Sequence, residues 1–313
     1  MLENLADPRG VVLRRDVIAL GLNDNWLARM VRAKELVRVR QGAYALRQRW
    51  TDAAKVERHL MLASAVLRQY DDRPVAASHV TACVMQGGPA WGLDLSRVHL
   101  TSLHGISERN QAKVVHHRGV CLVGDVTRRD GHWMTTPART ALDTACLAGR
   151  EAGVCVLDWY LHEGLTTWSE LVTTFHAMKE WPDTLGLYRT LHLSDGRSES
   201  VGETLLRLLI RDLGFPTPEL QWEVLYPNGR VAGRVDMAWP EYGLLLEFDG
   251  LAKYAQHRRP GESVADVVLR EKEREDLLRE LTGFRMIRIT WQDLERPEEI
   301  AQRLRRALAR GAR

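Results

Sequence analysis

The sequence predicts an α+β protein built from several domains. Its 313 residues exceed the usual size of a single hydrophobic core. Segments with the apolar spacing of helices are mixed with segments in which apolar and polar residues alternate as in strands. The polar, glycine-containing segment Asp195 to Ser198 interrupts both patterns and is typical of a linker. We therefore predict domains over residues 1–50, 51–195 and 196–313.

The composition is that of an ordinary globular protein. Hydrophobic residues make up 45% of the chain and charged residues 27%, which excludes disordered and fibrous classes. No apolar run approaches the roughly 18 residues of a membrane span, and the N-terminus lacks the pattern of a signal peptide, so we expect a cytoplasmic protein without a membrane partner. The cysteines form no Cys-x-x-Cys pair and are interpreted as reduced thiols: Cys83, Cys121, Cys146 and Cys155.

The first domain has the pattern of two short helices followed by a hairpin. Apolar spacing over residues 13–20 predicts one helix, and Asp24 or Asn25 can cap a second helix that runs through Trp26 and Val31. Two strand-like segments, 36–40 and 43–46, flank the turn signal Gln41-Gly42. Helix, turn, helix and a two-stranded wing together predict a winged helix-turn-helix.

Charge supports a DNA-binding role for this domain. Residues 1–50 hold nine Arg and one Lys against five acidic residues, a balance of +5, whereas the whole chain carries +3. In a helix-turn-helix the second helix enters the major groove, so we expect Asn23, Asn25 and Arg29 to face bases. The expected phosphate contacts are Arg32, Arg38 and Arg40. The alternative is that Arg32 complements the helix dipole and that both wing arginines lie on an ordinary solvated strand face.

Residues 10 to 46 resemble the N-terminal winged helix of the AbiEi type IV antitoxins, with VRAKELVRVRQGAYAL at the end of the recognition helix and in the wing. That family binds promoter DNA and represses its own operons, which implies double-stranded DNA as a partner and a cognate toxin as a candidate partner. A homodimer is a further candidate assembly. Residues 51–195 resemble the family's middle region and predict an α/β domain, to which the resemblance assigns no chemistry.

The middle region mixes helix and strand patterns. We expect helices over 53–70, 76–83 and 138–147, the last opened by Pro137, and strands over 97–101 and 112–117. Its histidines fit no standard ligand spacing, so we interpret them as structural or surface side chains: His79, His99, His104, His116 and His117.

The last domain contains the segment on which the chemical hypothesis depends, VDMAWPEYGLLLEFDG over residues 235–250. Alternation followed by a short turn and an apolar run predicts two paired strands, which brings Asp236 close to Glu247. Asp249 shares a face with Glu247. Carboxylates about 4 Å apart repel by roughly 4 kcal/mol at an effective dielectric near 20, so such a group requires a cation or a basic partner. Oxygen ligands suit Mg²⁺ or Mn²⁺, which points to phosphodiester chemistry.

Residues 198 to 310 resemble the PD-(D/E)XK nuclease superfamily, in particular its members related to the very-short-patch-repair endonuclease. The shared features are Glu-x-Asp-Gly, a charged helix, and a strand that ends at Thr-Trp. The resemblance implies a restriction-endonuclease-like α/β domain with a mixed sheet.

By motif position, the resemblance makes Asp236 and Glu247 metal ligands and Glu203 the helical acid. The chain departs from the pattern where the family has lysine, because Asp249 stands there, and Lys253 or Lys272 would have to supply the ammonium group.

Two classes of function follow from these observations. In the first, the chain is a DNA-binding, metal-dependent endonuclease in which the metal activates water at the scissile phosphate, Lys253 offsets phosphate charge and Glu203 supports the ion or a water. In the second, it is a non-catalytic antitoxin-like repressor whose last domain has become a binding module. The missing lysine favours the second reading, and the intact acids favour the first.

Overall fold

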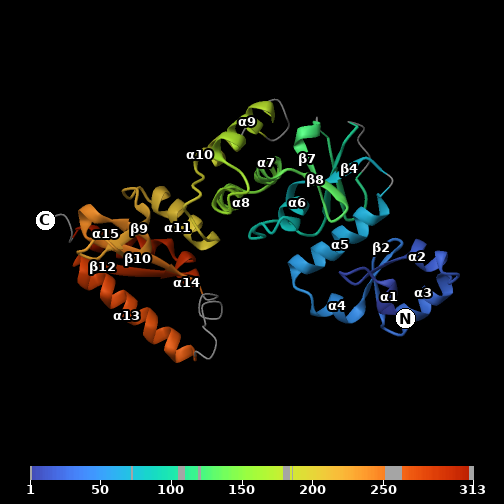
Figure 1. Ribbon diagram of the computed structural model, residues 1–313, viewed down its shortest axis with the longest axis horizontal. Helices are drawn as coiled ribbons and strands as arrows, with labels where there is room; N and C mark the ends of the chain where they lie inside the picture. The colour runs from blue at the N-terminus through green and yellow to red at the C-terminus, as the bar shows by residue number, and fades with distance from the viewer. Residues whose placement is uncertain are drawn as a thin grey trace. The chain divides into compact units, whose positions relative to one another are not determined.

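The computed structural model describes residues 2–71, 73–104, 110–118, 121–178, 184, 186–250 and 263–309. The chain folds as two compact units, 1–192 and 193–313 (Figure 1). Both units combine helices with sheets, so the predicted mixture of α and β structure is confirmed.

The beginning of unit 1 is a small antiparallel sheet with the strand order β1-β3-β2 and helices around it. The two helices and the hairpin are confirmed, and the structure adds a third strand and a short N-terminal helix that the pattern did not predict. Trp26, Leu27 and Val17 are buried against Val12 and Leu36, which fixes the inward side of the second helix. The elements are α1 (Leu2–Leu5), β1 (Val11–Leu13), α2 (Arg14–Ala19), α3 (Asp24–Arg32), β2 (Leu36–Arg40), β3 (Ala43–Leu46) and α4 (Arg47–Asp52).

The rest of unit 1 contains a mixed sheet with the order β6-β5-β4-β8-β7. Helices α6 to α10 build a separate core around Leu157, Tyr160 and Leu171. The elements are α5 (Lys55–Gln69), β4 (Val75–Ala77), α6 (His79–Met85), β5 (Val98–Ser102), β6 (Val114–His117), η1 (Val123–Asp125), β7 (Val126–Arg129), β8 (His132–Thr135), α7 (Pro137–Leu147), α8 (Arg150–His162), α9 (Trp168–Met178) and α10 (Leu187–His192).

Most predictions for this region are confirmed, and one is wrong. The helices expected from residues 53 and 137 and both expected strands are present within a few residues of the predicted bounds. Ala76 and Ala77, predicted at the start of a helix, lie instead in β4 opposite Thr101 and Leu100 of β5. A short apolar run does not distinguish strand from helix by periodicity, and here the pairing with β5 decides the structure.

Helix α5 joins the two sheets of unit 1. Its side chains Met61 and Ala65 belong to the core beneath the first sheet. Leu62 and Val66, one position further along the helix in each case, belong to the core beneath the second sheet. Because one helix is apolar on two sides, residues 1–192 pack as one compact unit.

Unit 2 is a four-stranded mixed sheet with the order β12-β11-β10-β9, in which only the β11–β12 pair is parallel. The two paired strands expected over residues 235–250, the charged helix after them and the strand that ends at Thr290 are confirmed. The elements are α11 (Val201–Asp212), β9 (Glu219–Leu225), β10 (Val231–Trp239), η2 (Pro240–Tyr242), β11 (Leu244–Asp249), α13 (Val264–Thr282), β12 (Arg285–Thr290), α14 (Trp291–Leu294) and α15 (Pro297–Ala309).

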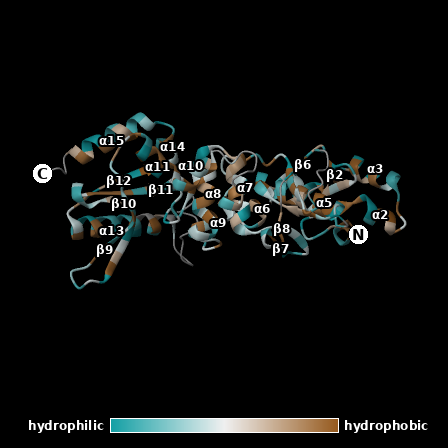
Figure 2. Ribbon diagram, turned by 90° about the horizontal axis from the view of Figure 1, so that it is seen from above, coloured by the Kyte–Doolittle hydropathy of each residue, from teal (hydrophilic) through white to brown (hydrophobic). Residues whose placement is uncertain are grey.

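Helices cover both faces of this sheet. Side chains of α11 and α15, including Leu206 and Leu304, pack on the face that carries Leu246. Leu278 of α13 packs on the opposite face, against Leu245. Hydrophobic residues run through the strands, whereas the long helix α13 is largely hydrophilic (Figure 2). Because Glu247 and Asp249 alternate with Leu246 and Phe248, which face α11, they lie on the α13 side. Asp236 is also close enough to Arg274 of α13 to raise the pKa of that arginine.

Gly202 allows α11 to approach the sheet closely. A Cβ atom at this position would lie 1.9 Å from the Phe248 ring, far inside van der Waals contact. The absence of a side chain therefore brings the first turn of α11, which carries Glu203, directly against β11.

Candidate functional site

Helix α3 presents a polar outer face at one end of unit 1. Asn23 caps it, because its Oδ1 accepts a hydrogen bond from the backbone N–H of Trp26 at 3.0 Å. With Trp26 and Leu27 buried, the side chains of Asn25, Arg29 and Arg32 are left exposed. The structure thus brings four of the predicted DNA contacts together on one helix.

The two predicted wing arginines have different surroundings. Arg38 of β2 is exposed. Arg40 instead donates to the side-chain oxygens of Gln69 at 2.9 Å and Gln111 at 2.6 Å, and its guanidinium lies over the Tyr70 ring. Arg38 is free to reach a phosphate, while the Arg40 side chain already links the hairpin to α5 and to the segment before β6.

An ion pair connects α2 and α3. Nε and Nη2 of Arg14 in α2 each donate to one oxygen of Asp24, both at 2.7 Å. The hydrogen bonds from Arg14 lower the pKa of Asp24. Asp24 lies in the first turn of α3, where a carboxylate also interacts favourably with the helix dipole. The pair is exposed to solvent, so its contribution to holding α2 against α3 is small.

The strand carboxylates of unit 2 converge as predicted from the hairpin. Met237 pairs with Leu246 in the β10–β11 ladder, so the next position places Asp236 opposite Glu247. Oδ2 of Asp236 accepts a hydrogen bond from the backbone N–H of Phe248 at 2.7 Å. Two strands therefore supply three carboxylates to the face of the sheet that α13 covers.

Arginine side chains meet these carboxylates. Glu247, only 8% exposed, accepts a hydrogen bond from Nη1 of Arg274 at 2.7 Å and lies 3.5 Å from Nη2 of Arg288. Arg288 also reaches Asp249 at 3.7 Å and Glu275 at 3.2 Å. Burial acts to lower the pKa of Arg274, but the adjacent Glu247 carboxylate outweighs it, so the pKa is raised. Guanidinium groups thus supply the positive charge that the carboxylate cluster requires.

Glu203 has a different set of partners. It is 3% exposed, and its two oxygens accept hydrogen bonds from the Ser200 hydroxyl at 2.7 Å, the Glu199 N–H at 2.9 Å and the Gln221 amide at 3.0 Å. The Glu203 N–H in turn donates to the Ser200 hydroxyl. This reciprocal arrangement caps α11.

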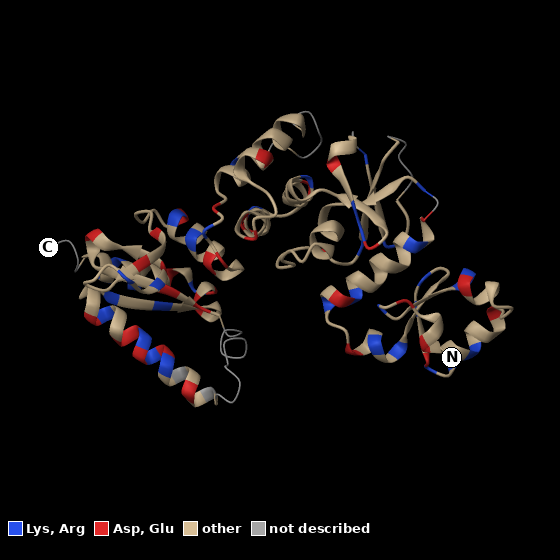
Figure 3. Ribbon diagram, in the orientation of Figure 1, with Lys and Arg blue, Asp and Glu red and all other residues tan. Residues whose placement is uncertain are grey.

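Of the two lysines proposed for catalysis, the structure describes Lys272 alone. Lys253 lies outside the described residues. Lys272 is exposed on α13, along which acidic and basic residues alternate (Figure 3). The cations that contact Glu247 are Arg274 and Arg288, which the sequence analysis did not identify. The parallel pairing of Glu247 with Arg288 would have indicated one of them.

Magnesium chemistry does not fit this arrangement as it stands. The oxygen donors are the kind that Mg²⁺ prefers, but those of Glu247 contact guanidinium groups and those of Glu203 cap a helix. Within the described parts of the chain, no group of three or more His, Cys, Asp or Glu side chains is placed to hold a metal ion.

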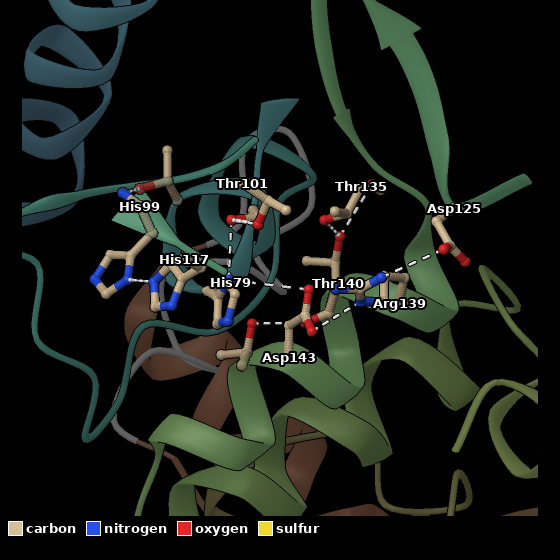
Figure 4. Close-up of polar contacts among 12 residues, drawn as sticks. His79, His99, Thr101, His117, Asp125, Thr135, Arg139, Thr140 and Asp143 are labelled. Carbon is tan, nitrogen blue, oxygen red and sulfur yellow. Dashed lines mark hydrogen bonds and ion pairs between the residues drawn. The ribbon is translucent and has the colours of Figure 1, made fainter. Parts of the chain in front are cut away.

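A second polar cluster lies inside unit 1 (Figure 4). Nδ1 of His99 lies 2.7 Å from Nε2 of His117, whose ring stacks on that of His79 at a centroid distance of 3.5 Å. Nδ1 of His79 lies 2.9 Å from the Ser78 hydroxyl and 3.9 Å from Oδ2 of Asp143. The row of rings therefore ends at a buried carboxylate.

Burial dominates the titration of this cluster. It lowers the pKa of His99 to about 3, assisted by His117, and lowers that of His79 well below the usual value. Burial also raises the pKa of Asp143 to about 6, although Nε of Arg139 donates to its Oδ1 at 2.8 Å. His79 has a φ of 51°, a conformation rarely adopted by residues other than glycine. The imidazoles of His79 and His99 are thus neutral at pH 7, as expected for structural histidines. His104 is exposed.

These features define unit 1 as a mixed α and β unit with an exposed polar helix, and unit 2 as a sheet with an acidic cluster balanced by arginines. Residues 1–47 match a family described as "Transcriptional regulator, AbiEi antitoxin".

Two relatives come from Mycobacterium tuberculosis, the uncharacterized protein MT2308 of strain CDC 1551 and the uncharacterized protein Rv2248 of strain H37Rv. Each is 29% identical over 236 residues, which cover 74% of this chain and 82% of the relative. Among the helices in the described ranges, none is both long and apolar enough to cross a membrane.

Proposed function

We propose that the protein is a DNA-binding transcriptional regulator that reads duplex DNA with a winged helix-turn-helix formed by residues 1–50. The observation that carries this proposal is the match of residues 1–47 to a family of transcriptional regulators. The exposed face of α3 supports it, because a helix anchored by Trp26 and Leu27 offers Asn25 and Arg29 to the major groove.

The side chains divide into two roles. Asn25 and Arg29 contact base edges, and Asn23 has its amide N–H₂ left for the same purpose while its oxygen caps α3. Arg32 and Arg38 contact phosphates. Arg40 contributes less, because its guanidinium is held by Gln69 and Gln111.

The salt dependence of binding tests these roles. The affinity of the full chain for a duplex covering the region upstream of its own gene should fall with salt, measured by fluorescence anisotropy. Arg38→Ala should reduce the log–log slope by about 0.9, the value for one phosphate contact. Arg40→Ala is the matched control on the same strand and should change the slope by less. Equal slopes for wild type and Arg38→Ala would contradict the phosphate role, and unchanged affinity in Asn25→Ala and Arg29→Ala together would contradict recognition by α3.

We further propose that a cognate toxin is a protein partner, because the matching family is described as an antitoxin. Co-expression with the product of the adjacent gene, followed by purification of a stoichiometric complex, tests this partner. A second copy of the chain is a further candidate, since helix-turn-helix proteins often bind paired half-sites. Footprinting of two half-sites about one helical turn apart would support the dimer.

For unit 2 we propose a binding module rather than a hydrolase. The arginine contacts of Glu247 and the capping role of Glu203 support this choice. Metal-dependent phosphodiester cleavage with Asp236, Glu247, Asp249 and Lys253 stays a prediction, and the placement of Asp236 opposite Glu247 favours it.

Plasmid incubation distinguishes the two proposals for unit 2. The purified chain should leave supercoiled plasmid intact with Mg²⁺ or Mn²⁺ if unit 2 is a binding module. Cleavage that requires the metal and disappears in Asp236→Ala would instead establish the nuclease. Cleavage that persists in Asp236→Ala would identify a contaminant, and Glu241→Ala, on the nearby turn, controls for the loss of an acid.

A further inference from the structure

A cavity of about 760 Å³ opens in unit 1 at the start of α5. Its walls come from the α4–α5 junction, from the segment 90–96 that follows α6, and from Lys113 just before β6. Pockets of this size commonly bind small organic molecules. No part of the proposed DNA-binding face or of the histidine row in Figure 4 lines it.

The interior of the cavity is apolar. Val56, Leu62, Leu93 and Leu95 contribute to it, together with the Trp50 ring. The one imidazole in the wall, that of His59, has both nitrogens engaged, with Nδ1 2.9 Å from the Leu95 carbonyl and Nε2 3.1 Å from the Thr81 hydroxyl. Burial lowers the pKa of His59, so this wall is neutral and its polar atoms are satisfied without a ligand.

The edge of the cavity is cationic. Lys55, Arg58 and Lys113 line it, against one acid, Asp94. Arg58 donates to the Trp50 and Thr51 carbonyls at 2.8 Å, and Nζ of Lys113 donates to the Val39 carbonyl at 3.1 Å. Carbonyl oxygens carry no net charge, and none of the three cations forms an ion pair within the described ranges. The edge therefore keeps an excess of positive charge.

Lys113 is also held in an unfavourable backbone conformation. Its φ is 64°, in the left-handed region that a lysine rarely adopts. Strain of this kind persists only where the surrounding structure maintains it, and it is concentrated at binding sites. Lys113 lines the cavity in this conformation, with its ammonium group donating to the Val39 carbonyl.

We propose that this cavity binds a small organic anion with an apolar body, such as a fatty or aromatic acid. The apolar interior takes the body of the molecule, and Lys55 and Lys113 meet its acidic group. A neutral molecule of the same shape gains only the apolar contacts, and a hydrophilic anion gains only the charge. This ligand class goes beyond DNA recognition, and its binding does not require DNA.

Two fluorescent probes of nearly equal shape test the proposal. Anilinonaphthalene sulfonate is an amphipathic anion, and N-phenylnaphthylamine is its neutral counterpart. The full chain without DNA should bind the anion at one saturable site and more tightly than the neutral probe. Lys55→Gln and Lys113→Gln should each reduce the affinity for the anion by about threefold or more, in the range of one partly exposed ion pair. Neither change should alter the affinity for the neutral probe. Val56→Trp, which places a bulky ring in the cavity wall, should weaken both.

The exposed Arg129 of β7 provides the matched control, because Arg129→Gln removes a cation of unit 1 that lies outside the cavity. Octanoate should displace the bound anion. Equal affinity for both probes, or equal losses in Lys55→Gln and Arg129→Gln, would overturn the charge recognition. Binding that is undiminished in a folded Val56→Trp would overturn the location, and Lys55→Gln, an exposed change that leaves the core intact, keeps the test decisive if Val56→Trp does not fold.

Discussion

In two places the protein pairs buried carboxylates with arginines, and the two clusters differ in how far their arginines are exposed to solvent. In unit 1, Arg139 is 1% exposed and lies between Asp143, 2% exposed, and Asp125. In unit 2, Glu247 is similarly buried, but its partners Arg274 and Arg288 remain about 30% exposed. A pair fully removed from water has no alternative partner, because losing one member leaves a buried charge. In the second cluster the arginines are open to solvent, so water and ions can replace a partner that is lost. The first cluster is therefore structural, and the greater exposure of the arginines in the second supports the binding role proposed for unit 2.

Removing the buried arginine should produce the largest effect. Arg139→Met leaves Asp143 without its cation in the core of α7, so we expect a loss of about 3–5 kcal/mol in the free energy of unfolding. Arg139→Met with Asp143→Leu removes both charges and should recover most of that loss. Urea denaturation of the full chain measures both. If the single variant loses less than the double variant, the pair does not stabilise unit 1.

The loss of an arginine from the Glu247 cluster of unit 2 should cost less stability, and we expect the carboxylates left behind to bind a metal ion. Arg274→Met removes the nearest cation from Glu247, and we expect a loss of about 1–3 kcal/mol, typical of a buried acceptor left unpaired. Arg279→Met, one helical turn and a little further along α13, breaks only an exposed pair with Glu275 and should change stability by about 0.5 kcal/mol or less.

Millimolar Mn²⁺ should raise the melting temperature of Arg274→Met more than that of the wild type, because the freed carboxylates bind it in the folded state. Asp249→Asn in the same background should reduce the gain. A metal response equal in wild type and variant would show that the arginines do not occupy a cation position, which would weaken the distinction between the two clusters.

The stacked rings of His99, His117 and His79 should have a smaller effect on stability, and this effect depends on pH. The pKa of His99 is about 3 in the folded state and ordinarily near 6.5, so between these values the unfolded chain binds a proton that the folded chain does not. Stability from this group is present above pH 6.5 and falls by up to about 1.4 kcal/mol per unit as pH decreases below it. His99→Gln should therefore flatten the decline in melting temperature between pH 7 and 5. The raised pKa of Asp143 makes the folded state more stable as the pH decreases below 6, which opposes the effect of His99. Because Asp143 is present in both the wild type and His99→Gln, its contribution cancels when their melting temperatures are compared. A variant with an unchanged decline would contradict this origin.

Local patterns predicted local structure well. The turn at Gly42 and the hairpin from Val235 to Phe248 depend on residues close together in the sequence, and each lies where the pattern indicated. The same hairpin predicted that Asp236 and Glu247 converge. The predicted cap of the second helix, Asp24 or Asn25, was wrong by at least one residue, because Asn23 accepts the hydrogen bond from the Trp26 N–H and Asp24 already begins α3.

Contacts between residues far apart in the sequence could not be predicted from such local patterns. Arg288 reaches Glu247 only because β12 pairs in parallel with β11, across the intervening helix α13. The histidine row combines α6, β5 and β6, and no spacing in the chain indicates that these rings stack. The carboxylate pattern therefore predicted the need for a positive charge, expected from a lysine or a metal ion, whereas the fold supplies arginines.

Helix α5 determines how this protein can be dissected. Met61 and Ala65 share a hydrophobic core with Val11 and Ala45 of the first sheet. Leu62 and Val66 belong to the core beneath the second sheet. A fragment that ends at residue 50 would turn the underside of the first sheet toward water, and one that begins there would leave a bare hydrophobic stripe on α5. The first sheet therefore depends on α5 for its core, and the same helix supplies part of the core of the second sheet.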